Sequence, residues 1–195
     1  MKKYFFLIIL LMNPPAFLEA KDFVGLRIAT KINVTSFSVF PKKISNPPSA
    51  WVPGASVHAY LGGLKGEGVY YGGHAFACVE RGVSEKSSWT LIPSHCWGGG
   101  LVTGAIVQKT FLTSFGLGCL QSIFSMKSPQ GKKYNQEMFF GYVEIMTESL
   151  LTGALSSEVS YRYAFALSEN AHQSKAIFEK RAAMHTFSVG IILHL

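Results

Sequence analysis

The sequence predicts an all-β protein, a closed antiparallel eight-stranded up-and-down transmembrane β-barrel. Three observations predict this fold. Aromatic residues make up 13% of the chain and charged residues only 15%, which is a low charge content for a soluble domain. Segments of about ten residues or more with alternating side-chain character recur between polar or Gly/Pro-rich breaks. These breaks are alternately long and short, an asymmetry typical of outer-membrane barrels.

The first twenty residues predict a secretory signal peptide, residues 1–20. Lys2 and Lys3 form its basic start, an apolar core follows from Tyr4 to Met12, and Ala20 precedes the expected cleavage site. The apolar run is about half the length that a membrane-spanning helix needs. We therefore expect residues 21–195 to form one outer-membrane barrel domain.

The clearest alternation lies in the first half of this domain. Leu26 and Ile28 share one parity while Arg27 and Lys31 share the other, so the segment has an apolar and a polar face. A proline-containing loop, residues 40–51, follows this segment, and a glycine-rich break at 63–68 follows the next. The strands expected here span residues 24–39, 54–62 and 69–80.

Glycine blurs the alternation in the middle of the chain. Residues 81–96 are expected to form a long loop, with a start of the next strand inside this segment as the alternative, and residues 127–136 a polar loop. Alternation is clear again near Tyr161 and Tyr163, which belong to an aromatic-rich face opposite Arg162. The strands expected in this half span residues 98–108, 112–126, 137–148, 154–167 and 185–195.

Charged and histidine side chains of the polar faces are expected inside the barrel. An eight-stranded closure leaves an interior just wide enough for side chains to fill, and ion pairs between them offset the desolvation of isolated charges. We therefore expect a small porin-like barrel with a filled interior, because a wide water-filled pore needs many more strands. The expected interior polar network is Arg27, Lys31, His58, His74, Glu80, Glu144, Glu148, Glu158 and Arg162.

A soluble, secreted, ligand-binding β-barrel is the alternative fold, because alternation alone does not say which face points inward. Two observations favour the membrane. The apolar faces carry aromatic residues, as the interfacial girdles of membrane proteins do. The other faces carry few charges and many Gly, Ala and Ser residues, which does not suit a well-solvated exterior.

The chain ends on an alternating segment that we expect to face lipid and to close the cylinder against residues 24–34. Every second residue of this last strand is apolar. Chain termini are usually loose unless something holds them, so this pattern predicts a structural role. The apolar positions are Phe187, Val189, Ile191, Leu193 and Leu195.

The segments EVSYRYAF and HTFSVGIILHL resemble strands of the OmpA/OmpX-like class, the small eight-stranded outer-membrane barrels of Gram-negative bacteria. The resemblance covers residues 21–195 and lies in the pattern rather than in a diagnostic motif. It implies location in the outer membrane, contact with outer-membrane lipid and lipopolysaccharide, and insertion by the outer-membrane assembly machinery. That machinery reads a terminal alternating strand that usually ends on an aromatic residue, where this chain has Leu195. The resemblance also implies a structural role, or a surface interaction through external loops.

Catalysis is not expected, with a lipid A-modifying acyl hydrolase as the alternative. One barrel family of this size deacylates lipid A through a motif that resembles His-x-Ser-Asn followed by a Glu. Here Ser168 and Asn170 lie near the matching place, but Ala166 stands where the His is needed. A hydrolase needs its nucleophile and base within hydrogen-bond reach, which a loop holds poorly. A second such arrangement lies in the expected loop and consists of His172, Ser174 and Glu179.

No cofactor, metal or nucleic-acid partner is expected. His95 and Cys96 are adjacent, but a zinc site needs three or four ligands. The excess of basic residues is scattered along the sequence and fits an acidic membrane surface better than nucleic acid. The sequence does not choose a disulfide among Cys78, Cys96 and Cys119, and three unpaired thiols are an equal alternative.

Overall fold

The structure is a computed structural model that describes residues 23–38, 49–65, 68–80, 90–107, 111–127, 131, 133–152, 154–170 and 182–195. The expected signal peptide lies outside the described residues. Within them, no helix has the length and apolar character needed to cross a membrane.

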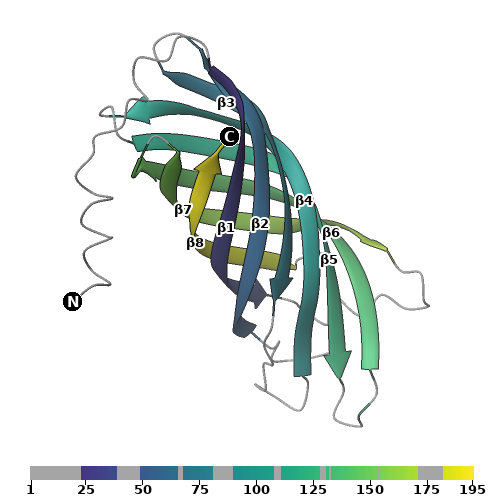
Figure 1. Ribbon diagram of the computed structural model, residues 1–195. Coiled ribbons are helices and arrows are strands. Elements are labelled where there is room, and N and C mark those ends of the chain that lie inside the picture. The colour runs from purple at the N-terminus through teal and green to yellow at the C-terminus, as the bar shows by residue number, and fades with distance from the viewer. Residues whose placement is uncertain are drawn as a thin grey trace, which may run out of the picture.

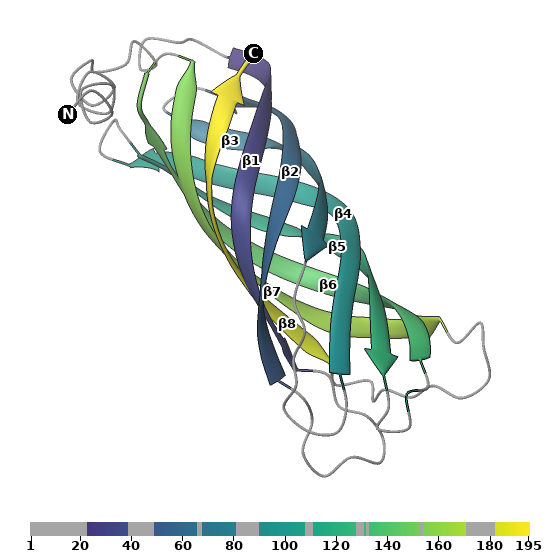
Figure 2. The ribbon, with the colours of Figure 1, turned by 60° about the horizontal axis from the view of Figure 1, so that its bottom comes forward.

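Eight antiparallel strands form one closed barrel, in which each strand pairs with its neighbours along the chain and β8 pairs with β1 (Figure 1). The expected all-β, up-and-down, eight-stranded fold is therefore confirmed. The strands are strongly tilted about the barrel axis (Figure 2), as closure of a sheet requires. They are β1 (Phe23–Ser38), β2 (Ser49–Lys65), β3 (Val69–Glu80), β4 (Thr90–Val107), β5 (Phe111–Lys127), β6 (Lys133–Leu150), β7 (Leu155–Asn170) and β8 (Ala183–His194).

The last strand closes the cylinder as the sequence predicts. The β1–β8 register runs from Arg27 opposite His194 to Ser38 opposite Ala183. The short connections after β2, β4 and β6 lie at the same end as the start of β1 and the end of β8, which we call the inner end. The connections after β1, β3, β5 and β7 join strands at the opposite, outer end. Those after β1, β3 and β7 are long, as expected, but the expected long connection after β5 is only residues 128–132 because β6 begins at Lys133.

Three strands begin inside segments expected to be loops, residues 40–51, 81–96 and 127–136; for 81–96 this agrees with the alternative that the next strand starts within it. β2 starts at Ser49, β4 at Thr90 and β6 at Lys133. In β4 the register with β5 shifts between Pro93 and His95, and such an irregularity breaks the period-two pattern. The first residues of β6 are polar because they extend the β5–β6 hairpin beyond the apolar part of the wall.

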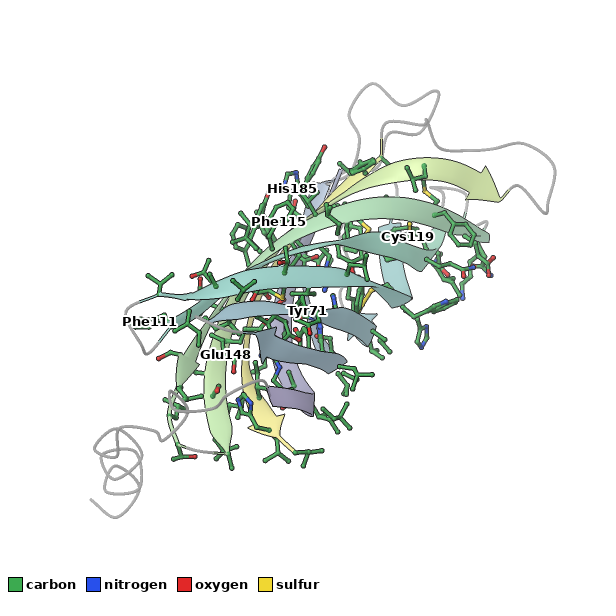
Figure 3. The ribbon with its side chains drawn as sticks, turned by 90° about the horizontal axis from the view of Figure 1, so that it is seen from above. Tyr71, Phe111, Phe115, Cys119, Glu148 and His185 are labelled. Carbon is green, nitrogen blue, oxygen red and sulfur yellow. A yellow bond between two sulfur atoms is a disulfide. The ribbon has the colours of Figure 1, made fainter. Side chains whose placement is uncertain are left out.

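The two faces of the sheet differ as a membrane barrel requires, with the apolar face outward and the polar face inward. Large apolar side chains cover the outer wall: Leu101 is 75% exposed, Ile32 73% and Val189 60%. Phe111 and Phe115 are among these outward side chains (Figure 3). A soluble barrel buries this face and exposes the polar one, so the soluble alternative is wrong.

Two apolar clusters sit inside the barrel, one toward each end. Near the outer end, Phe37 packs edge-on against Phe124 with ring centroids 5.3 Å apart, and Met138 and Phe140 join them. Nearer the inner end, a second cluster includes Tyr70, Val102 and Ile192. The polar network occupies the interior between and beside these clusters.

Cys78 and Cys96 form a disulfide across adjacent strands. They are direct partners in the β3–β4 register, with Cα atoms 5.1 Å apart, a separation well suited to a disulfide. Cys119 is free and exposed on the outer wall. The structure thus selects one pairing among those that the sequence left open.

Arginine substitutions at two depths of β4 test which face meets lipid. Leu101 lies six residues from Val107, the last residue of the strand, or about 15 Å along the membrane normal for a tilted strand. We expect Leu101→Arg to destabilise the folded barrel in bilayers by about 2–4 kcal/mol and Val107→Arg by no more than about 1 kcal/mol. Urea titration with heat-modifiable gel mobility measures both, and equal small effects would contradict a lipid-facing wall.

Thiol counting tests the disulfide. In the unfolded but unreduced protein, a maleimide reagent should label one cysteine, Cys119, because the other two are bonded to each other. After reduction the same chain should take three labels. Mass spectrometry of the labelled protein gives the count directly, and three labels without reduction would exclude the Cys78–Cys96 bond.

Candidate functional site

The nine side chains expected in the interior network all point into the barrel and are buried. Each lies on the inward parity of its strand, so the alternation of the strand is what positions it. All have relative exposures of 7% or less. They form three ion pairs and one stack of rings, with Glu80 apart from both.

The ion pair nearest the inner end joins strands on both sides of the seam between β8 and β1. Arg27 on β1 donates to Glu148 on β6 at 2.5 Å, and His194 Nε2 on β8 lies 3.0 Å from the same carboxylate. The Arg27 guanidinium also lies over the Tyr70 ring, 4.3 Å from its centroid. These contacts tie β8 and β1 to the far wall of the barrel.

A second ion pair lies further along β1. Lys31 Nζ contacts the Glu158 carboxylate and donates to the Tyr60 hydroxyl at 2.8 Å. Tyr60 in turn donates to Glu158 Oε2 at 3.2 Å. Three strands therefore share one hydrogen-bonded unit, in which the ammonium and the carboxylate each have more than one partner, as buried charges require.

The third ion pair is covered by aromatic rings. Arg162 Nη2 lies 3.0 Å from both carboxylate oxygens of Glu144. Its guanidinium sits 3.7 Å from the centroid of Phe76 and 5.0 Å from that of Tyr142. Contact with ring faces adds a favourable cation–π term when the cation is desolvated.

His58 and His74 lie in a stack of rings rather than in a ligand site. Their ring centroids are 5.5 Å apart, and Phe76 stacks on both at 5.2 Å. His58 Nδ1 lies 3.4 Å from the Tyr60 hydroxyl, and His74 Nδ1 lies 3.4 Å from the hydroxyl of Tyr142.

Glu80 sits beside the disulfide at the outer end of β3. One ligand-type atom from each of Cys78, Glu80 and Cys96 lies within 4.8 Å of the others. The disulfide uses both sulfur atoms, and a metal needs thiolates rather than a disulfide as ligands. The oxidised protein therefore offers one donor here, which does not fit a metal site.

Each of the three interior cations has a carboxylate partner, and Glu80 is the one carboxyl among the nine residues outside these pairs. Three cations, Arg27, Lys31 and Arg162, face three carboxylates, those of Glu148, Glu158 and Glu144. Together with the two apolar clusters they fill the cylinder with paired charges and packed rings. This arrangement suits a structural interior and not a path for ions.

Several further side chains complete this network, and alternation alone does not identify them. The ring partners of the cations and the second partner of Glu148 all have inward parity, but alternation says nothing of which strands face each other across the barrel. Only the register and closure bring them together. The residues are Tyr60, Tyr70, Phe76, Tyr142 and His194.

The residues of the hydrolase alternative gain no support. His172, Ser174 and Glu179 lie outside the described residues. By backbone position, Ser168 and Asn170 are among the last residues of β7. Ala166 packs against the apolar cluster near the outer end.

The outer end presents a basic hairpin. Lys127 and Lys133 are direct partners at the tip of β5–β6, and both are exposed. Gly131, in the connection between them, has a φ of +79°, a left-handed conformation that glycine adopts without strain. Below the tip, Ser125 Oγ donates to Asn135 Oδ1 at 2.7 Å, which holds the two strands together outside the apolar wall.

Comparison with solved structures shows small outer-membrane barrels. Neisserial surface protein A matches with a TM-score of 0.60 and 11% identity, over 89% of this chain and 99% of that one. The attachment invasion locus protein of Yersinia pestis, Ail, matches with a TM-score of 0.57 and 10% identity, over 89% of this chain and 100% of that one. No protein-family model and no curated protein sequence matches the chain. The chain therefore has the fold of the small eight-stranded outer-membrane β-barrels, as its resemblance to the OmpA/OmpX-like class implies.

Neutralising one carboxylate tests the interior network. Glu144→Gln leaves the Arg162 guanidinium buried without its counter-charge, so we expect a loss of about 3–5 kcal/mol in unfolding free energy. Glu137→Gln on the same strand is the control, because Glu137 is only partly buried and accepts a hydrogen bond from Gln121; its loss should stay below about 1 kcal/mol. Denaturant titration of the barrel in lipid vesicles measures both, and equal losses would contradict the assigned pairing.

Proposed function

We propose that the protein is an integral outer-membrane barrel with a structural interior, which acts at its outer end by binding polyanionic glycans. The apolar outer wall and the likeness in fold to Neisserial surface protein A and Ail support the membrane location. The filled interior with its paired charges supports a structural role for the cylinder itself. Export through residues 1–20, and recognition of the terminal strand by the assembly machinery despite Leu195, are part of the same proposal.

The observation that carries this proposal is the distribution of charge between the two ends. The four connections at the outer end, residues 39–48, 81–89, 128–132 and 171–182, contain eight Lys and Arg residues and two Glu residues. The three inner connections contain one Lys and one Glu. Basic residues that are scattered along the sequence are thus brought to one end by the up-and-down topology, which focuses a positive field there.

The β5–β6 hairpin is the described part of this basic end. Its tip carries Lys127 and Lys133 side by side, and the hydrogen-bonded strands below keep them at a fixed spacing. Lysine ammonium groups bind sulfate and phosphate groups as point charges. A repeating anionic glycan fits such a surface better than a single small anion, because many weak contacts add along a polymer.

A structural neighbour gives independent support for this ligand chemistry. Ail has been solved in complex with the heparin analogue sucrose octasulfate, and that structure matches this chain with a TM-score of 0.56 and 11% identity, over 88% of this chain and 99% of that one. The likeness concerns the fold. The basic outer end is this chain's own feature, and it is the reason for proposing the same class of ligand.

Charge reversal at the hairpin tip tests the proposal. We expect Lys127→Glu and Lys133→Glu each to weaken binding of heparin to the refolded barrel in detergent about fivefold at low salt, since each reversal replaces an attraction with a repulsion near the surface. The difference should shrink at higher ionic strength. Lys109→Glu, with the same charge change in an inner connection, should leave binding unaltered.

Biolayer interferometry on immobilised heparin gives these affinities. If Lys109→Glu weakens binding as much as the two outer substitutions, attraction is set by net charge alone and the outer end is not the binding surface. If the unsubstituted barrel shows no affinity for heparin at low salt, the proposed ligand class is wrong.

A further inference from the structure

An aromatic hollow lies on the outer wall near its outer end. Its cavity volume is about 500 Å³, within the range of pockets that hold small organic ligands. Four strands contribute to it, because β7, β8, β1 and β2 lie side by side across the closing seam. We call it the outer-wall hollow; its lining residues are Ser36, Trp51, Tyr161, His185 and Phe187.

Side-chain size explains why the wall is indented here. Ser36 is the direct register partner of both Trp51 and His185, so one small side chain lies between two large ones. Phe187 completes the rim, with its ring centroid 6.0 Å from that of Trp51 and 4.8 Å from that of Tyr161. The result is a trough with a serine floor and aromatic sides.

The trough is apolar along its sides and polar at one position. Trp51 is 60% exposed and Phe187 50%, so both rings offer free faces. Tyr161 and His185 are joined by a hydrogen bond of 2.8 Å between the hydroxyl and Nδ1. When the tyrosine donates, the neutral imidazole carries its proton on Nε2, and an N–H donor then belongs to the hollow. His185 lies on the outer surface of the barrel (Figure 3).

We propose that the outer-wall hollow binds one molecule of the phosphorylated glycolipid lipid A, with an acyl chain over Ser36 along the exposed sides of Trp51 and Phe187 and a headgroup oxygen accepting from His185. The inference rests on the proposed membrane location. It does not depend on the glycan bound at the outer end. The hollow opens on the wall that faces lipid, so a lipid molecule is its natural occupant.

Position and charge favour a glycolipid of the outer leaflet over a zwitterionic or singly charged phospholipid. Ser36 lies two residues from the outer end of β1, and Trp51 and His185 each lie two residues from the outer end of their strands. The connections that join these four strands at that end carry five Lys and Arg residues and one Glu. Two phosphate groups on one headgroup complement that excess better than one phosphate does.

Filling the floor of the hollow tests the inference. Ser36→Leu places a larger apolar side chain where the acyl chain would lie, yet keeps the outer wall suited to lipid. Thr30→Leu is the matched control, because Thr30 is an exposed, outward residue of the same strand outside the hollow. We expect Ser36→Leu to weaken binding of diphosphorylated lipid A about tenfold, the equivalent of about two displaced methylene groups, and Thr30→Leu to leave binding unchanged.

A paired aromatic substitution provides a second test. Trp51→Ala with Phe187→Ala removes both sides of the hollow and should lower lipid A binding further than Ser36→Leu. The control pair is Trp97→Ala with Phe115→Ala, since these side chains are 43% and 42% exposed on the outer wall away from the hollow. That pair should retain full binding, because it alters the general aromatic surface only.

Native mass spectrometry of the refolded full barrel, titrated in detergent with lipid A and in parallel with phosphatidylglycerol, gives the bound fractions. Selective loss of lipid A in the two hollow variants supports the inference. Equal binding of lipid A by all variants overturns it, and so does equal affinity for the two lipids. Loss of lipid A binding in Lys127→Glu but not in Ser36→Leu would place the lipid at the basic end, which overturns the hollow and leaves the proposed function standing.

Discussion

Closure of the backbone hydrogen-bond network is the constraint on which the rest of this structure depends. A sheet edge in hydrocarbon leaves amide and carbonyl groups without partners, at several kcal/mol for each group. The pairing of β8 with β1 from Arg27 opposite His194 to Ser38 opposite Ala183 removes both edges at once. Closure also requires the strands to tilt, and a cylinder of eight strands leaves an interior just wide enough for side chains to fill. With no edge exposed, the outer face needs only apolar side chains to meet lipid.

Closure of the barrel also determines how the charged side chains of the interior are paired. Closure removes inward side chains from water, so each charge inside must find its partner on another strand rather than along its own. Arg162 pairs with Glu144, its direct register partner on the neighbouring strand β6, and contacts the faces of Phe76 and Tyr142. Arg27 and Lys31 connect β1 to β6 and β7. The network therefore stabilises one arrangement of the strands, since a shift of register would separate several oppositely charged pairs together.

Much of the fold could be predicted from period-two alternation, and the failures have a common physical origin. Leu26 and Arg27, or Tyr161 and Arg162, fall on opposite faces because a strand allows nothing else. The start of β6 was missed, and that of β4 was expected only as an alternative, because Thr90–Pro93 and Lys133–Gln136 are strand by pairing rather than by apolar pattern. Inward parity also placed the charged residues inside. Parity does not reveal that Tyr142 faces His74, or that Ser36 forms the floor of a hollow, because both facts depend on neighbours across strands.

The disulfide between Cys78 and Cys96 has a consequence for a protein at an exposed surface. The two cysteines are 18 residues apart and flank the outer connection between β3 and β4. A protease that cuts this connection once divides the chain, yet the two pieces stay covalently joined at the rim of the barrel. The neighbouring strands also keep their backbone pairing. Peptide bonds in this connection are therefore not what holds the barrel together, and the segment is free to vary in sequence and length without loss of the cylinder.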